Sequence, residues 1–507
     1  MKPPIRINKS RVTQKTNTKT NHVMHNELMA PRPEFWHRYV LELSRFRPEA
    51  TLEILAGLSQ TAKEARDLSG RSVTKWEKKF LRHTFTHDNI ARDVILHSSL
   101  RGSAIPREAD IERLCGRYLN LEDPILRDSS RNGIERYSVR IAYEQFKYQL
   151  WPYGELCRSW ALYGDTGAQL DASAMSPSAW RNSLGCDLLS FLRMIFCVGI
   201  MAGRNSGVMT RDTMNWDVLS RAAPGLTEHD FSTALKNLTS TIVTHRKQSS
   251  RPTKGYEKYA FNPLTSRPLI SNDDRLVVPS AFLLMQRAWP NNLYYDRVGE
   301  EDFRNQIGGL FEAYVGRQLQ QLEANEIAHV HPEIKYIESG EEGASTDWIV
   351  VFPNLVLLVE AKAGRLREPS RLGLDDLDQD VARTLGIAYR QLERSARLII
   401  EGNRAFAHIP NDRPLLGFAV TLDPFWLHRD PLQATPRPFN MEIHPVGIHE
   451  IEVLIQAALA GPIESVMADL CTHADNEARR VRRVLADCEL VGNPILDSVF
   501  DELFPET

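Results

Sequence analysis

One stretch of the sequence, residues 345–362, constrains the fold most strongly because it predicts a tight β-hairpin. Two apolar runs rich in β-branched residues flank a Pro-Asn turn signal at 353–354. A hairpin closed symmetrically around that turn places Asp347 directly opposite Glu360, with Cβ atoms roughly 5 Å apart. Lys362 follows Glu360 by two residues and therefore lies on the same face of its strand. Two carboxylates and one ammonium group thus converge at the open end of the hairpin.

Carboxylates that face each other at the end of a buried hairpin repel, unless one keeps its proton or a cation lies between them. A hard divalent cation with an anionic substrate would account for the carboxylates and the lysine together. The sequence has two other E-x-K triplets, which begin at Glu77 and Glu333. Glu77 lies in a helical pattern, and Glu333 follows Pro332 with no apolar run before it. Only the triplet at Glu360 combines a strand, a turn and an opposed aspartate.

Length and composition place limits on the class of protein. A chain of 507 residues exceeds one typical core, so we expect two or three domains. The net charge is only −3, so a nucleic-acid site would be a local basic patch. The six cysteines form no C-x-x-C pair, which argues against a zinc site and a disulfide framework and is typical of a reducing cytoplasm. The polar N-terminus lacks an apolar h-region, so we expect no secretory signal and a cytoplasmic location.

The most apolar stretch, residues 188–203, is too short for a membrane span and carries Arg193 in its middle. A buried, central helix is the better interpretation of this pattern. We therefore expect no association with a membrane.

The first 240 residues show no recognisable chemistry. Residues 1–30 predict a disordered basic tail, with six Lys and Arg side chains before the first acidic residue, Glu27. Such a tail makes loose phosphate contacts or is simply a solvated terminus. Residues 31–240 have apolar residues at three- and four-residue spacing, which predicts a helical domain for recognition, regulation or assembly. Its aromatic residues are predicted to pack in the core rather than to stack on bases: Trp36, Trp76, Phe146, Trp151 and Trp160.

Residues 241–300 predict a linker with one small β-hairpin around the turn at 271–274. Basic side chains are dense between His245 and Lys258, with Tyr256 and Tyr259 interleaved. This composition suits contact with a single strand or a nucleic-acid backbone, and it also suits a solvated linker.

Residues 301–447 predict a mixed α/β domain, and residues 448–507 predict C-terminal helices. Residues 303–322 form an amphipathic helix with Glu312 at the edge of its apolar face, so this side chain points to solvent or lines a cleft. The further expected elements are a strand at 328–337, the hairpin, an Arg-rich loop at 364–374, a helix at 376–400, and strands at 415–422 and 441–446. The fold class is α+β and multidomain, with a central mixed sheet flanked by helices. The phosphate-binding glycine motifs of ATPases and dinucleotide enzymes do not occur.

Asp347 followed by Glu360-Ala361-Lys362 at the end of an apolar strand resembles the D…(D/E)-x-K signature of the PD-(D/E)XK, or restriction-endonuclease-like, nucleases. The run from Gly308 to Glu312 resembles the G-x-x-F-E element of several branches. Thr346 stands where the signature names proline. Gln391 resembles a glutamine that some branches place on the next helix, and a plain surface glutamine fits equally well. The resemblance covers residues 302–422.

This resemblance implies a restriction-endonuclease-like core and a metal-dependent reaction. Asp347, Glu360 and the backbone carbonyl of Ala361 would hold Mg²⁺ or Mn²⁺ through oxygen ligands, with Glu312 as a further carboxylate. Lys362 would position water or neutralise the transition state. The products would carry a 5′-phosphate and a 3′-hydroxyl. The expected protein is a DNA endonuclease in prokaryotic defence or restriction, whose helical region recognises a target or a partner protein.

Two alternatives stay open. Nuclease-like domains also occur as silent nucleic-acid-binding or assembly modules, although such a module needs no opposed carboxylates. An RNase is the second alternative, because no motif in the sequence reports a contact with a 2′-hydroxyl.

Overall fold

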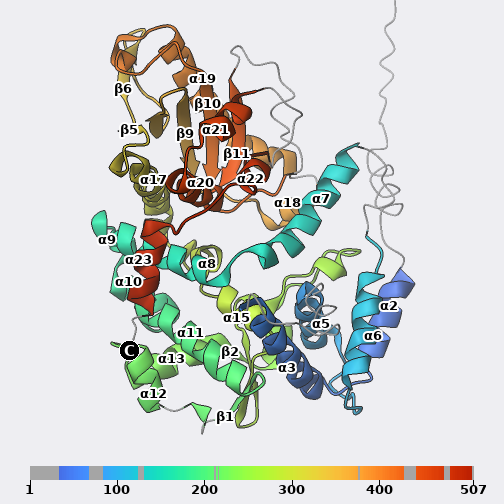
Figure 1. Cartoon of the computed structure of the whole chain (residues 1–507). Coiled ribbons are helices and arrows are strands. Elements are labelled where there is room, and N and C mark those ends of the chain that lie inside the picture. The colour runs from blue at the N-terminus through green and yellow to red at the C-terminus, as the bar shows by residue number, and fades with distance from the viewer. Residues whose placement is uncertain are drawn as a thin grey trace, which may run out of the picture.

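The computed structural model is an α+β structure in which helices predominate (Figure 1). The residues that it describes are 33–67, 84–123, 131–210, 213–214, 216–374, 377–427, 441–472 and 480–504. The predicted basic tail at 1–30, with Glu27, lies outside these residues, as do Trp76 and Glu77. The described strands form a five-stranded sheet, a four-stranded sheet and a two-stranded ribbon.

Helices dominate the chain before residue 250, as the apolar periodicity predicts. They are α2 (Pro33–Leu43), α3 (Pro48–Asp67), α5 (Thr84–His97), α6 (Glu108–Leu119), α7 (Arg131–Gln145), α8 (Pro152–Ser159), α9 (Gly167–Gln169), α10 (Pro177–Leu184), α11 (Leu188–Arg204), α12 (Trp216–Ala222), α13 (Glu228–Leu238) and α14 (Ile242–Gln248). A π-helical segment at Trp160–Thr166 joins α8 to α9. Most of these helices fill the lower half of Figure 1.

The helix α11 is central, as predicted, and most of its residues are buried. Arg193 in its middle donates hydrogen bonds to the backbone carbonyls of Pro224, Glu502 and Leu503. The donors of this guanidinium are therefore hydrogen-bonded inside the protein. Within the described residues no single helix is long and apolar enough to span a membrane. The bent pair of α10 and α11 together meets these two criteria, by length and composition alone.

The small sheet joins the helical region to the segment predicted as a linker. Its strands are β1 (Val208–Thr210), β2 (Thr239–Ser240), β3 (Leu269–Asn272) and β4 (Arg275–Val277), in the order β1-β4-β3-β2. The strands β3 and β4 are antiparallel, which confirms the predicted hairpin. Two helices follow it, α15 (Ala281–Gln286) and α16 (Pro290–Arg297).

The five-stranded sheet is mixed, as predicted. Its strands are β5 (His329–Pro332), β8 (Trp348–Val351), β9 (Val356–Lys362), β10 (Leu415–Thr421) and β11 (Glu442–Gly447), in the order β11-β10-β9-β8-β5. The strands β9, β10 and β11 run parallel to one another, and β8 is antiparallel to both β9 and β5.

The single strand predicted at 328–337 is wrong, because it divides into two. The first part is β5, and the second is β6 (Lys335–Glu338), which pairs with β7 (Glu341–Ala344) in a separate ribbon. Pro332 ends β5 because proline has no backbone N–H to donate to a neighbouring strand. The loop at 364–374 likewise contains a short helix, α18 (Glu368–Arg371).

Helices cover both faces of the five-stranded sheet. The helices α17 (Glu301–Ala324) and α20 (Ile448–Ala460) lie on one face, and α19 (Leu377–Ile400) lies on the other. Along β9, Leu357 and Val359 belong to the hydrophobic cluster of α17, whereas Val356 and Leu358 belong to that of α19. The alternation places Glu360 on the face toward α19.

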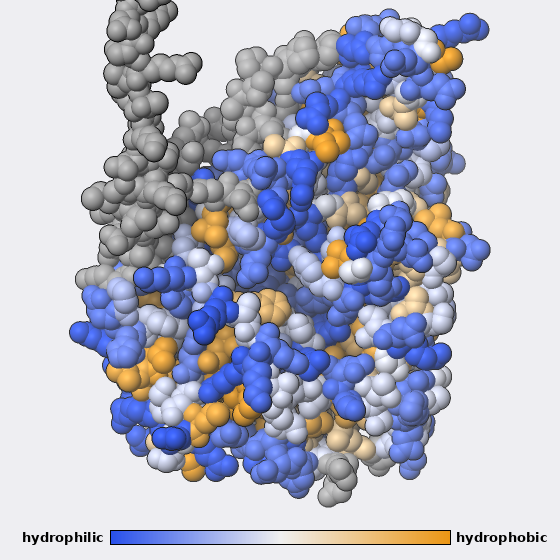
Figure 2. Space-filling model, turned by 180° about the vertical axis from the view of Figure 1, so that it is seen from behind, coloured by the Kyte–Doolittle hydropathy of each residue, from blue (hydrophilic) through white to orange (hydrophobic). Residues whose placement is uncertain are grey.

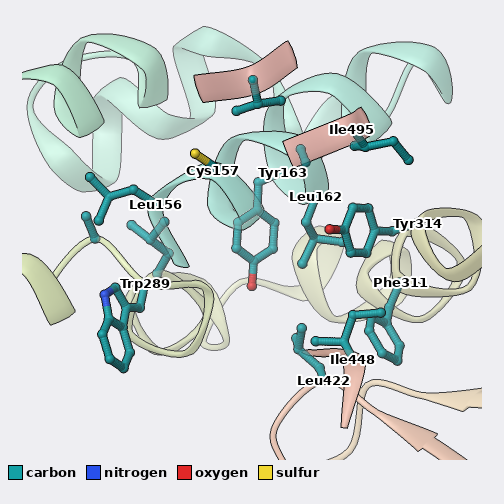
Figure 3. Close-up of a cluster of buried hydrophobic side chains, with 14 of the residues drawn as sticks. Leu156, Cys157, Leu162, Tyr163, Trp289, Phe311, Tyr314, Leu422, Ile448 and Ile495 are labelled. Carbon is teal, nitrogen blue, oxygen red and sulfur yellow. The ribbon is translucent and has the colours of Figure 1, made fainter. Parts of the chain in front are cut away.

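A continuous hydrophobic cluster joins the helical region to the sheet (Figure 3). Leu156 and Tyr163 contribute to it from the helical region, Phe311 from α17, Leu422 from the end of β10, and Ile495 from the C-terminus. The C-terminal helices are α21 (Glu464–Cys471), α22 (Arg480–Leu485) and α23 (Pro494–Leu503). This cluster includes residues on both sides of the predicted domain boundaries at 240, 300 and 447. The division of the chain into those domains therefore stays a prediction.

A buried polar network crosses the same interface. The guanidinium of Arg158 on α8 forms an ion pair with Glu452 on α20, and the Tyr314 hydroxyl donates to the same carboxylate at 2.7 Å. Gln318 donates to the Tyr314 hydroxyl at 3.0 Å, and Asn493 donates to Gln318 at 2.9 Å. Removing one partner of a buried ion pair of this kind destabilises a protein by several kcal/mol. The network therefore holds α8 against α17 and α20.

One expectation for a core side chain is wrong. Trp151 is 61% exposed and stacks against Phe500 rather than packing in the core.

In the basic-aromatic stretch, Arg246 donates to the last carbonyls of α5 at Val94, Ile95 and Ser98, which caps that helix. This arginine therefore has a structural role, and the two interpretations of the whole stretch stay predictions. From behind, the surface is mostly hydrophilic, with hydrophobic residues in small separate groups (Figure 2).

Gly316 gives a test of how α17 packs on the sheet. A Cβ atom at this glycine would lie 2.0 Å from the ring of Trp348, the first residue of β8. We expect Gly316→Ala to destabilise the protein by about 1–3 kcal/mol, because the indole and helix must separate. The free energy of unfolding in urea measures this change.

Gly309→Ala in the same helix is the matched control, since a Cβ atom there meets nothing within 4 Å. It should leave stability unchanged or raise it by up to about 1 kcal/mol through helix propensity. Equal effects of the two substitutions would show that α17 does not contact Trp348 closely.

Candidate active site at the end of the β8–β9 hairpin

The register of the hairpin is the predicted one. Trp348 pairs with Val359, and Val351 pairs with Val356. Continuing this register by one residue places Asp347 opposite Glu360. Glu360 is fully buried and Asp347 is 9% exposed, so both carboxylates lie inside the protein at the open end of the hairpin.

Hydrogen bonds tie the two carboxylates to each other's strand. The N–H of Ala361 donates to Oδ2 of Asp347 at 2.7 Å, and the N–H of Asp347 donates to Oε2 of Glu360 at 3.3 Å. Lys362 forms an ion pair with Oε1 of Glu360 and keeps a quarter of its side chain exposed. The structure thus brings together the three side chains that the sequence selects. The predicted role of the Ala361 carbonyl as a ligand stays a prediction.

Both carboxyl groups hold their protons more tightly than exposed side chains do. Burial and the charge of Asp347 raise the pKa of Glu360 to about 7, although Lys362 and Thr346 act in the opposite direction. Burial also raises the pKa of Asp347, partly offset by the Ala361 N–H and by Lys362. The expected repulsion between opposed carboxylates therefore appears as a preference for the protonated form.

Two hydroxyl groups that were not expected from the sequence position Glu360. The Thr346 hydroxyl lies 2.6 Å from the Val359 carbonyl oxygen and 3.1 Å from Oε2 of Glu360. The N–H of Thr346 donates to the hydroxyl of Ser395 on α19 at 2.8 Å. Thr346 occupies the position where the signature names proline. That departure is the one signal in the sequence that the side chain at this position has another role.

Two further carboxylates lie near the pair. Glu312 on α17 is half-buried; burial and the charges of Asp347 and Glu333 raise its pKa. This agrees with the cleft orientation rather than the solvent one. Glu333 is exposed, and it lies opposite Asp347 when the pairing of Pro332 with Trp348 is continued by one residue. On the sequence alone Glu333 follows Pro332 with no apolar run before it and no aspartate predicted opposite, since the register between β5 and β8 cannot be read from either strand.

Gln391 lies on α19, the helix that covers the face toward which Glu360 points. Its backbone carbonyl accepts a hydrogen bond from Ser395 at 3.0 Å, one turn before the contact of that serine with Thr346. Among the described residues its side chain makes no hydrogen bond with Asp347, Glu360 or Lys362. Its predicted catalytic role stays a prediction.

The donor atoms suit a hard cation in type, since they are carboxylate oxygens with a backbone carbonyl beside them. Glu360 already accepts from Lys362 at one oxygen and from the Thr346–Asp347 turn at the other. A cation on Glu360 would therefore compete with these donors. The described residues contain no group of three or more His, Cys, Asp or Glu side chains arranged to hold a metal ion.

Comparison of the chain with protein-family models, with curated proteins and with solved structures gave no match. The geometry of the site therefore carries the functional argument.

The raised pKa of Glu360 predicts a specific dependence of stability on pH. Between its ordinary value of 4.5 and about 7, the folded protein binds the proton more tightly than the unfolded chain does. The stability from this group is present below the lower value and is lost as the pH rises toward the upper one. We expect wild type to lose on the order of 1–3 kcal/mol more than Glu360→Gln between about pH 4.5 and about pH 7.5.

Urea unfolding of both proteins without metal across this pH range measures the difference. Glu341→Gln, at an exposed glutamate of β7, should follow the wild-type curve. Parallel curves for wild type and Glu360→Gln would show that Glu360 is ionised as readily in the folded protein as in the unfolded chain.

Proposed function

We propose that this protein is a metal-dependent nuclease that hydrolyses phosphodiester bonds of DNA. The observation that carries the proposal is the convergence of Asp347, Glu360 and Lys362 at one end of the β8–β9 hairpin. Two buried carboxylates that both have raised pKa values, with Asp347 contributing to the raised pKa of Glu360, are an unfavourable arrangement for a purely structural role. A divalent cation and a phosphate group would remove the repulsion and use the lysine.

Asp347 and Glu360, with the Ala361 carbonyl, are the groups that would hold Mg²⁺ or Mn²⁺. When bound, the cation would supply activation of a water molecule and neutralisation of charge on the scissile phosphate. Glu312, on the edge of α17, adds a further negative group beside Asp347.

The side chains of the chain itself have distinct tasks in this scheme. Thr346 orients Glu360 through its hydroxyl, and Ser395 holds the Thr346 backbone in place. Lys362 is the partly exposed cation of the group, so it is the one available to an incoming phosphate. On release from Glu360, its ammonium group would position the attacking water or stabilise the negative charge that develops on the phosphate.

The surrounding elements also support the proposal. The chain order of α17, the hairpin, α19 and β10 is the order that a restriction-endonuclease-like core implies. The proposed setting is prokaryotic defence or restriction, with the helical region contacting a target or a partner protein.

A silent nucleic-acid-binding or assembly module is the second candidate. One observation favours it: both oxygens of Glu360 already accept hydrogen bonds from protein groups, so this carboxylate has hydrogen-bond partners without a cation. The two candidates differ in whether Mg²⁺-dependent degradation occurs and whether EDTA stops it.

Cleavage of plasmid DNA in Mg²⁺ tests the proposal. We expect Asp347→Ala, Glu360→Ala and Lys362→Ala each to lower the cleavage rate by at least about 10²-fold, because each removes a group that acts on the reacting phosphate. Circular dichroism and thermal unfolding check that the variants are folded. Lys335→Ala, at an exposed lysine of the other described E-x-K triplet, should keep full activity.

Full activity in any of the three folded site variants would overturn the assignment, and so would cleavage that survives EDTA. Supercoiled, linear and single-stranded DNA and an RNA of the same sequence should be compared in parallel. Cleavage of the RNA alone would replace the DNA substrate with RNA.

A further inference from the structure

A cavity of about 760 Å³ lies between the helical region and the five-stranded sheet. Gly364 and Arg365 follow β9, Leu422 and Asp423 follow β10, and Ile448 follows β11, so one wall is the carboxyl edge of three parallel strands. Ligands bind at this edge in many α/β proteins. The other wall comes from α5, α7 and the segment around α16. The volume is within the range of small-molecule sites.

The lining is basic and aromatic. It contains eight arginines and lysines against four carboxylates. Buried arginines of the lining are paired: Arg92 contacts Asp93 at 2.8 Å and Arg140 contacts Asp123 at 2.7 Å. Phe261 and Tyr295 also line the cavity, and they are 53% and 49% exposed. The cavity lining therefore combines many cationic side chains, most of them ion-paired, with accessible aromatic rings.

Arg365 differs from the other buried arginines of the lining. It is only 8% exposed, and none of the described carboxylates forms an ion pair with it. Its guanidinium donates to the backbone carbonyl and the side-chain oxygen of Asn291, both at 2.8 Å, and stacks 4.0 Å from the ring centre of Tyr294. A buried charge without a counter-charge is costly, and an anion in the cavity would compensate for it.

Unsatisfied polar atoms on the lining side chains agree with this. The described structure gives no hydrogen-bond partner to Nε of Arg365, Nη2 of Arg92, Nε1 of Trp289 or Oε1 of Gln286. Three of these four atoms are donors. Buried donors without partners are rare in folded proteins, so these four atoms are polar groups beside the cavity that the described residues leave uncompensated.

We propose that this cavity binds a nucleoside phosphate, with Arg365 as the main contact to the phosphate and Phe261 stacking on the base. Planar guanidinium groups match phosphate oxygens, and exposed aromatic rings stack on any base. The same chemistry comes from two sources, a free nucleotide or one nucleotide of a strand. The inference does not rest on nuclease activity, because the cavity side chains named here are separate from Asp347, Glu360 and Lys362.

Isothermal titration calorimetry of the full chain in EDTA tests the proposal without cleavage. The probes are the four ribonucleoside 5′-monophosphates, a short single-stranded DNA and inorganic phosphate. We expect at least one mononucleotide or the oligonucleotide to bind wild type. Arg365→Gln should weaken this binding about tenfold or more, since a charge-assisted hydrogen bond is lost. Binding of mononucleotides identifies a free ligand, and binding of the oligonucleotide alone identifies a strand.

Two further variants make the result decisive. Phe261→Ala changes an exposed side chain and should weaken nucleotide binding about fivefold or more while leaving any binding of inorganic phosphate unchanged. Arg394→Gln is the matched control, because Arg394 stacks 5.2 Å from the ring centre of Tyr336 outside the cavity. Absence of binding to every probe, or equal binding by wild type and a folded Phe261→Ala or Arg365→Gln variant, would overturn the proposal.

Discussion

The antiparallel pairing of β8 with β9 in a single register is the constraint on which the candidate site depends. Ile349 and Leu358 face α19 and Val350 and Leu357 face α17, so apolar packing on both sides of the sheet holds that register. A slip of one residue would exchange the two faces of the strand. The register then brings two carboxylates together at the strand ends, where burial makes their contact unfavourable. The apolar packing of the two strands maintains the register in the folded protein despite this local repulsion.

The sequence was sufficient for those features whose signal is local. The β-branched runs around a Pro-Asn turn define the hairpin register, and the apolar spacing of α17 defines its buried face, including Phe303 and Leu322 at its two ends. Composition alone identified α11 as a buried helix. In each case neighbouring residues in the chain carry the pattern, because strand and helix periodicities repeat within a few residues.

The features that the sequence did not reveal depend on contacts between distant segments. Glu333 approaches Asp347 only through the register of β5 with β8, and Ser395 reaches Thr346 only because α19 crosses the strand. The wrong expectation for Trp151 has the same origin, since its stacking partner Phe500 belongs to the distant helix α23. The basic cavity is assembled from α5, α7, α16 and three strand ends, so no single stretch of sequence carries its signal.

The cavity and the candidate site share one structural element. Lys362 ends β9, and Arg365 in the cavity wall follows it by three residues. Arg158 of the buried network also lines the cavity, and its partner Glu452 lies on α20 against the sheet. The helical region is thus attached to the sheet around the cavity, and a ligand there would contact both parts. This geometry gives the helical region a direct physical connection to the strand that carries Glu360 and Lys362.

The central claim is that a divalent cation relieves the repulsion between Asp347 and Glu360. The most direct measurement is the change in unfolding temperature on addition of Mg²⁺, compared between wild type and Asp347→Asn at one pH above 7. Mg²⁺ should raise the unfolding temperature of wild type, because a ligand bound only to the folded state stabilises it. It should not raise that of the variant, which lacks one of the two carboxylates. An equal shift in both proteins, or none in wild type, would contradict the claim.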